Sequence, residues 1–246
     1  RSIPNTAFAE LGQTWSHPKV AMIKGHANPV LIFGAGYDTN EDVEPPNADT
    51  MGRGIFIVDA VTGNVLWQAG PGGAGSSCTG NPCKLAEMTY SIPADVTLVD
   101  RDFDGLIDRL YAADTGGNIW RVDLQPTGSG DISTWQATHF AALGGSATSA
   151  TKRKFFFPPD VVLTKMYDVV LVITGGREQP LPVHYAATGI VNRFYMIKDT
   201  KVGMSASGWT TVRDDTSSSA DLAPAALFKA TNTIPYDGSL NGFYVT

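Results

Sequence analysis

A short unit occurs twice in this chain and restricts the fold to one built from β-hairpins. Each copy reads as a β-strand that ends in Asp, a turn that contains Gly-Asn, and a second strand that carries Trp. The copies span residues 54–68 and 110–124. Glycine accepts the positive φ of such turns, and the carboxylate of Asp59 or Asp114 can accept hydrogen bonds from turn amides. We therefore predict two hairpins, with Trp67 and Trp120 on a buried face.

Apolar segments bounded by glycine precede these hairpins and extend the pattern. They span residues 29–36, 94–99 and 167–175. A weaker third copy of the hairpin unit covers residues 193–201 and is followed by Trp209. An apolar strand, a loop and a hairpin, repeated, are typical of propeller blades. At about 40–45 residues per blade, the chain holds at most five or six blades. We predict an all-β fold, a modified β-propeller with quinoprotein-like blades that is incomplete or irregular. A β-sandwich with similar hairpins is the alternative.

Composition supports this fold class. Charged residues make up 17% of the 246 residues, below the usual ~25%, and Gly and Pro are frequent, as in an all-β protein with many turns. Small polar segments read as loops between strands, so we assign residues 1–246 to a single β-propeller domain. The chain opens abruptly at Arg1, and residues 243–246 read as an unfinished strand. We expect a fragment of a longer protein.

Charge and hydropathy exclude two classes of partner. Eighteen basic and 24 acidic residues give a net charge of −6, and no basic stripe is visible, so we expect no nucleic-acid binding. The best apolar run, residues 169–174, has the length of a strand, so we expect no membrane span. The basic run 152–154 and the acidic stretch 38–44 are interpreted as solvated loops, and a second cation at 38–44 is the alternative.

The two cysteines lie close together in the segment Cys-Thr-Gly-Asn-Pro-Cys, residues 78–83. Gly80, Asn81 and Pro82 favour a turn that brings the two sulfurs together. A zinc site would need further ligands nearby, and none lie within sequence reach. We predict a local disulfide between Cys78 and Cys83, which favours an oxidising compartment.

Residues 100–108, Asp-Arg-Asp-Phe-Asp-Gly-Leu-Ile-Asp, have the spacing of a calcium-binding loop. Calcium takes six to eight oxygen ligands, and glycine at the sixth position permits the sharp turn that such loops need. The predicted ligands are the carboxylates of Asp100, Asp102, Asp104 and Asp108 and the main-chain carbonyl of Leu106. Position 12, where an EF-hand has a bidentate Glu, is Tyr111, so Asp108 must coordinate directly. The flanks read as strands instead of helices.

The stretch 100–124, a calcium loop that runs straight into a hairpin, closely resembles the C-terminal β-propeller of the PilC/PilY family. These proteins are tip-associated adhesins and assembly factors of bacterial type IV pili. Residues 11–20, 33–38 and 175–181 are also similar, so the resemblance covers most of the chain. Its most specific part is residues 100–124.

This resemblance implies a propeller on the cell surface, at the pilus tip or on the outer membrane. It also implies that calcium at Asp100, Asp102, Asp104, Leu106 and Asp108 regulates pilus extension against retraction. The implied partners are pilin or minor pilins, with adhesion to a host or surface ligand carried by an N-terminal region that is absent here. The expected roles are pilus (fimbrium) biogenesis, cell adhesion and twitching motility, and we expect no enzymatic activity.

Two other protein classes share parts of the pattern. Quinoprotein dehydrogenases of the PQQ type have the Asp-x-x-Thr-Gly-x-x-x-Trp hairpin of residues 59–67, but their paired cysteines are adjacent and their calcium holds a quinone. Integrin-like propellers repeat their calcium loops in several blades, whereas one clear copy is present here. The five tryptophans are also candidates for a sugar-binding platform, although core packing is the better interpretation for Trp67 and Trp120.

Overall fold

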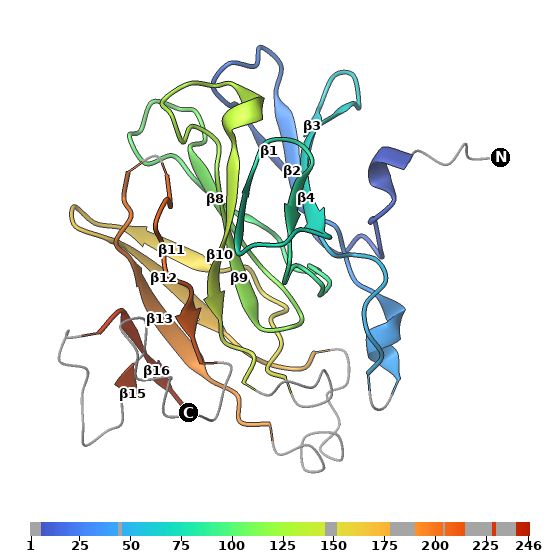
Figure 1. Ribbon diagram of the computed structural model, residues 1–246, viewed down its shortest axis with the longest axis vertical. Coiled ribbons are helices and arrows are strands. Elements are labelled where there is room, and N and C mark those ends of the chain that lie inside the picture. The colour runs from blue at the N-terminus through green and yellow to red at the C-terminus, as the bar shows by residue number, and fades with distance from the viewer. Residues whose placement is uncertain are drawn as a thin grey trace.

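The computed structural model describes residues 6–43, 46–145, 152–177, 190–203, 205–214, 228–229 and 240–246. Apart from three short 3-10 helices, the secondary structure of this part of the chain consists of β-strands. The helices are η1 (Thr6–Phe8), η2 (Thr39–Asp42) and η3 (Ile132–Thr134). The strands form three sheets, and in Figure 1 the second lies between the first, at the upper right, and the third, at the lower left. The prediction of an all-β fold is confirmed.

The first sheet has the order β1-β2-β3-β4-β6. Its strands are β1 (Lys19–Ala21), β2 (Val30–Gly34), β3 (Ile55–Asp59), β4 (Val65–Pro71) and β6 (Cys83–Leu85). The first four strands form an antiparallel meander, and β6 adds to β4 in parallel. The hairpin predicted at residues 54–68 is therefore the β3–β4 pair.

The second sheet has the order β14-β10-β9-β8-β7, and β5 also pairs with β10. Its strands are β5 (Ser77–Thr79), β7 (Thr97–Val99), β8 (Arg109–Ala113), β9 (Asn118–Asp123), β10 (Gln136–Ala142) and β14 (Val212–Arg213). Strands β7 to β10 form the antiparallel meander, and β14 adds in parallel. The hairpin predicted at residues 110–124 is the β8–β9 pair.

The third sheet has the order β11-β12-β13-β16-β15. Its strands are β11 (Asp160–Leu163), β12 (Asp168–Ile173), β13 (Phe194–Asp199), β15 (Phe228–Lys229) and β16 (Gly242–Val245). The prediction of a third hairpin unit, with residues 193–201 as its first part and Trp209 after it, is wrong. Strand β13 pairs with β12 and β16, whereas Trp209 stacks on Phe140 of the second sheet at 4.7 Å.

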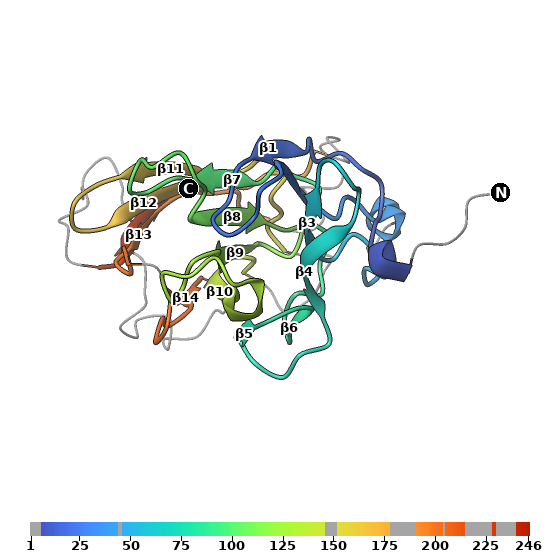
Figure 2. The same ribbon diagram turned by 90° about the horizontal axis from the view of Figure 1, so that it is seen from above.

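The second sheet is the middle layer, and both of its faces are buried. Side chains alternate along β8: Leu110 and Ala112 join the apolar core shared with the first sheet, and Tyr111 and Ala113 join the core shared with the third. This is the period-2 alternation of a strand that is covered on both sides. Figure 2 shows the three sheets as successive layers. No sheet closes on itself within the described residues, and the assignment of residues 1–246 to one domain stays a prediction.

Cys78 and Cys83 form a disulfide with a Cα–Cα distance of 5.5 Å. Cys78 lies on β5, which pairs with β10 of the second sheet, and Cys83 lies on β6, which pairs with β4 of the first. The bond therefore links the margins of two neighbouring sheets.

Candidate calcium centre

The candidate calcium loop, residues 100–108, joins β7 to β8. These two strands are antiparallel, with Val99 opposite Arg109, so the loop closes a strand-to-strand connection. The prediction that strands flank the loop is confirmed. An ion bound here would fix a β-connection, since the loop has no flanking helices to move.

Hydrogen bonds inside the loop curl its backbone. The Asp100 carboxylate accepts from the Gly105 amide at 2.9 Å, and Asp102 accepts from the Asp104 amide at 3.2 Å. Asp104 in turn accepts from the Leu106 amide at 2.8 Å. Gly105 has φ +89°, which is the left-handed conformation that glycine adopts at no steric cost. The sequence position of this glycine matches its backbone role.

Three carboxylates converge in the loop. Asp100, Asp102 and Asp108 each offer an oxygen, and these oxygens lie within 4.8 Å of one another. The Oδ1 atom of Asp100 is buried and has no hydrogen-bond partner among the described residues. Several carboxylate oxygens gathered around one point suit a hard cation such as calcium, so the residues present fit the ion that the sequence implies.

Asp108 is the most firmly held of the three. Its Oδ2 accepts from the Arg101 amide at 2.7 Å, and its Oδ1 accepts from the Gln125 side chain at 2.8 Å. Burial raises the pKa of Asp108, and the charges of Asp102 and Asp100 add to this effect. A cation between the carboxylates would remove that repulsion.

The other two predicted ligands are not part of this group. Asp104 is exposed, and its carboxylate is turned to the Leu106 amide. Its role as a ligand, like that of the Leu106 carbonyl, stays a prediction.

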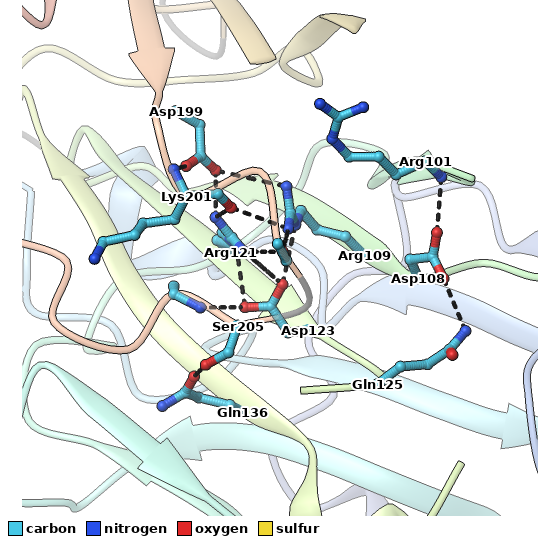
Figure 3. A network of polar contacts seen from close by, with 12 residues as sticks. Arg101, Asp108, Arg109, Arg121, Asp123, Gln125, Gln136, Asp199, Lys201 and Ser205 are labelled. Atoms are coloured by element: carbon cyan, nitrogen blue, oxygen red, sulfur yellow. Dashed lines mark hydrogen bonds and ion pairs between the residues drawn. The ribbon is translucent and has the colours of Figure 1, made fainter. Parts of the chain in front are cut away.

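A buried network of arginines and aspartates lies beside the loop, between the second and third sheets (Figure 3). Its charged members are Arg101, Arg109, Arg121, Asp123, Asp168 and Asp199. Three positive and three negative side chains balance. Five of the six have side chains that are at most 2% exposed, and that of Arg101 is 20% exposed.

Within the network, each arginine from the second sheet contacts an aspartate on the third. Arg109 donates to Asp168 at 3.0 Å, and Arg121 donates to Asp199 at 2.6 Å. Both arginines also bond to Asp123 on β9. The Tyr111 hydroxyl completes the set by donating to Asp199 at 2.5 Å.

The calcium loop contributes directly to this network. The guanidinium of Arg101, which lies between two of the converging aspartates in sequence, is 3.3 Å from the Asp168 carboxylate and donates to the Thr164 carbonyl at 2.7 Å. Arg109 directly follows Asp108. Two covalent neighbours of the loop carboxylates therefore contact or approach the third sheet. Sequence patterns did not predict this network, and its one visible signal is the presence of charged residues within otherwise apolar strands.

The structure describes residues 38–43 of the acidic stretch 38–44, and there the prediction of a solvated loop is wrong at Asp38 and Glu41, although Asp42 is exposed. Asp38 and Glu41 are each 1% exposed. Glu41 accepts a hydrogen bond from Lys154 at 2.5 Å. Lys154 belongs to the basic run 152–154, which was also expected to be solvated, and both Arg153 and Lys154 are buried. Glu41 and Lys154, 113 residues apart, thus bury each other's charge, whereas Arg153 pairs with Asp214.

Asp49 adjoins this pair and gives a pH-dependent prediction. Burial raises its pKa to about 7, nearby Glu41 adds to the shift, and the Ser91 amide, which donates to it, opposes the shift. A folded-state pKa above the unfolded value adds stability that is present below about pH 4 and is lost as pH rises through about 7. We expect the free energy of unfolding of Asp49→Asn to depend less on pH between 4 and 7 than that of the wild type. Urea unfolding at several pH values measures this. Asp160→Asn, an exposed site, is the control and should follow the wild-type slope.

Comparisons with known proteins bear on this arrangement. No family model matches the chain. A protein of Xylella fastidiosa described as a type IV pilus biogenesis factor PilY1 homolog is 28% identical over 116 residues, which is 47% of this chain and 7% of that protein. The crystal structure of the Pseudomonas aeruginosa PilY1 C-terminal domain matches 96% of this chain with a TM-score of 0.62 and 19% identity. The resemblance to the PilC/PilY family is confirmed.

The structural match also decides the fold class. The PilY1 C-terminal domain has a β-propeller-like fold, and the three layered sheets of this chain follow it. This chain covers 51% of the solved PilY1 chain, so it spans about half of that relative. None of the helices in the described part of the chain is long and apolar enough to cross a bilayer.

Proposed function

We propose that this chain is the calcium-binding, propeller-like part of a type IV pilus biogenesis and adhesion protein. The names of both relatives support the assignment to pilus biogenesis. The observation that carries the calcium site is the convergence of three carboxylate oxygens, with a buried, unpartnered oxygen on Asp100. In the proposal Asp100, Asp102 and Asp108 hold the ion, and Asp104 and the Leu106 carbonyl complete its shell. Calcium would supply positive charge that neutralises these oxygens.

We propose further that calcium occupancy regulates pilus extension against retraction. Arg101 and Arg109 support this step, because they continue from the loop into the buried network that contacts the third sheet. A loop stiffened by calcium would hold Arg101 against Asp168, whereas repelling carboxylates would loosen it. In this proposal the ion would therefore strengthen the contacts between the second and third sheets, and its loss would weaken them.

The proposed setting is extracellular, at the pilus tip or the outer-membrane surface. The Cys78–Cys83 disulfide supports an oxidising compartment. The proposed partners are pilin or minor pilins, with a host or surface ligand recognised by an N-terminal region of the longer protein. The proposal includes no catalytic role, because the Xylella fastidiosa relative is named as a pilus biogenesis factor PilY1 homolog and the solved structure carries the same PilY1 name, and neither is named as an enzyme.

Calorimetric titration tests the calcium site. We expect wild-type protein to bind one calcium ion with a dissociation constant between about 10⁻⁷ and 10⁻³ M. Asp102→Ala removes an exposed carboxylate whose one described hydrogen bond is to the Asp104 amide. It should weaken binding by at least about 10–100-fold, since even outer-shell residues have effects of that size. Asp160→Ala is the matched control. Equal affinity of Asp102→Ala and wild type would overturn the site.

Pilus function tests the regulatory role separately. A strain that carries Asp102→Ala in the full-length protein should differ from wild type in surface pili and twitching motility, and Asp160→Ala should not. If calcium affinity falls while pilus number and movement stay the same, the calcium site stands and regulation by it is refuted.

A further inference from the structure

A cleft of about 610 Å³ lies where the chain enters the strands β1, β7 and β11, one at the edge of each sheet. Residues 15–17 precede β1, residues 93–95 precede β7 and residues 156–158 precede β11. These three strands lie along one side of the molecule in Figure 2. The volume is within the range of about 300–1,000 Å³ that small-molecule sites occupy. Nothing in the calcium site uses this cleft.

An exposed tryptophan forms one wall of the cleft. Trp15 is 45% exposed, whereas Trp67, Trp120 and Trp135 are fully buried. The Trp15 indole stacks on Tyr37 with ring centres 4.3 Å apart and planes 7° apart. Tyr37 is itself 1% exposed, so the indole is held from behind. A rigid, half-exposed aromatic face provides contact area at low entropic cost, and the C–H face of a pyranose ring packs well on such a surface.

The polar groups of the cleft favour an anion. Among the described residues that line it, Asp95 is the one carboxylate; it accepts from the His17 amide at 2.6 Å and is paired with Lys19 at 2.9 Å. Arg177 also lines the cleft, with its guanidinium over the Phe157 ring at 5.4 Å. In the part of the chain that the structure describes, no carboxylate is paired with Arg177. Lys19 balances the charge of Asp95, so among the described lining residues the guanidinium of Arg177 is the group that can pair with an anion.

We propose that this cleft binds an acidic glycan, with one pyranose ring stacked on Trp15 and its carboxylate on Arg177. The apolar walls formed by Phe156 and Phe157 bury the C–H faces of the sugar. The His17 side chain is 84% exposed, and its Nδ1 is 3.1 Å from the Asp95 carboxylate, so its Nε2 is the atom that bonds to the sugar hydroxyls. Arg is the side chain best suited to planar, bidentate recognition of a carboxylate. This proposal is independent of calcium binding and of the pilus assignment.

A glycan microarray with matched pairs tests the proposal: glycans that end in sialic or uronic acid, and the same glycans with that sugar neutral or absent. Wild-type protein should prefer the carboxylated member of each pair. Trp15→Ala should bind both members of each pair about tenfold or more weakly than the wild type does. Arg177→Met should lose about tenfold in affinity for the carboxylated member alone, since a charge-assisted hydrogen bond to the carboxylate is then missing.

Two controls keep the result specific. Trp15→Phe retains an aromatic face and should bind more tightly than Trp15→Ala. Met166→Ala, an apolar residue that is 79% exposed and is not among the cleft residues, should bind like wild type. The proposal is overturned if wild type retains no glycan, if Trp15→Ala binds like wild type, or if Arg177→Met keeps the preference for carboxylated glycans. It is equally overturned if proline-rich peptides bind through Trp15 and glycans do not.

Discussion

Arg121→Met should lower the free energy of unfolding by about 3–5 kcal/mol, because removal of one partner leaves buried charges uncompensated. The Arg121 side chain is 0% exposed and bonds to both Asp123 and Asp199. It also donates to the Lys201 carbonyl at 2.8 Å. Methionine fills a similar volume, so the decrease in the free energy of unfolding comes mainly from the lost charge and hydrogen bonds and less from lost packing. Urea unfolding followed by tryptophan fluorescence measures it.

Two further variants separate the buried charge from a general effect of losing an arginine. Arg101→Met removes the most exposed cation of the same network and should cost clearly less than Arg121→Met. Adding Asp199→Asn to Arg121→Met should recover part of the loss, because the unpaired carboxylate is then gone. A loss below about 1 kcal/mol for Arg121→Met, as for a typical exposed ion pair, would contradict the prediction.

Asp114→Ala should destabilise the protein by a comparable amount, about 3–5 kcal/mol. Asp114 is fully buried and accepts from the Gly116 and Asn118 amides, the Asn118 side chain and the Trp120 indole at 2.8–3.1 Å. Each buried donor left without a partner costs about 1–3 kcal/mol, and relaxation recovers part of the sum. Burial raises the pKa of Asp114 to about 7, although Asn118 and Trp120 oppose the shift. Unfolding should therefore be measured at pH 8, where the carboxylate is ionised.

The first hairpin offers a matched comparison at the equivalent position. Asp59 accepts from the Val61 and Thr62 amides and from the His26 and Asn28 side chains. This turn lies nearer the solvent, since residues 60–64 are exposed, so water can replace the lost acceptor. Asp59→Ala should cost less than Asp114→Ala. Equal losses in the free energy of unfolding would mean that burial does not determine how much the turn aspartate contributes to stability.

Local chemistry explains why both hairpins could be predicted. The Asp59 and Asp114 turns need only a carboxylate, a glycine with positive φ and an alternating strand on each side, and all of these lie within fifteen residues. The third copy has Gly203 four residues after Asp199, but no Asn follows this glycine and its φ is not positive. Its Trp209 packs against Phe140 of another sheet. Resemblance in strand composition without turn chemistry was therefore not enough to place a hairpin.

In the candidate site, too, the part that depends on local sequence could be predicted and the part that depends on long-range contacts could not. Positions one, three and nine of the loop converge, because the glycine turn brings Asp108 back to Asp100 and Asp102. The buried network was beyond prediction, since Arg109 and Asp168 meet across 59 residues and Glu41 meets Lys154 across 113. Long-range ion pairs carry no local spacing rule. Both the acidic and the basic runs therefore read as solvated segments although Glu41 of one pairs with Lys154 of the other.

The disulfide has a mechanical consequence for a protein proposed to work on a retracting filament. Cys78 lies on β5 of the second sheet and Cys83 lies on β6 of the first sheet, so one covalent bond joins the two sheets. A force that pulls these two sheets apart is carried by the disulfide bond, so the turn at residues 79–82 is not extended. The second and third sheets have no such bond in the described chain, and side-chain contacts hold their seam. Under a pulling force we expect the contacts between the second and third sheets to break first, while the disulfide keeps the first and second sheets together.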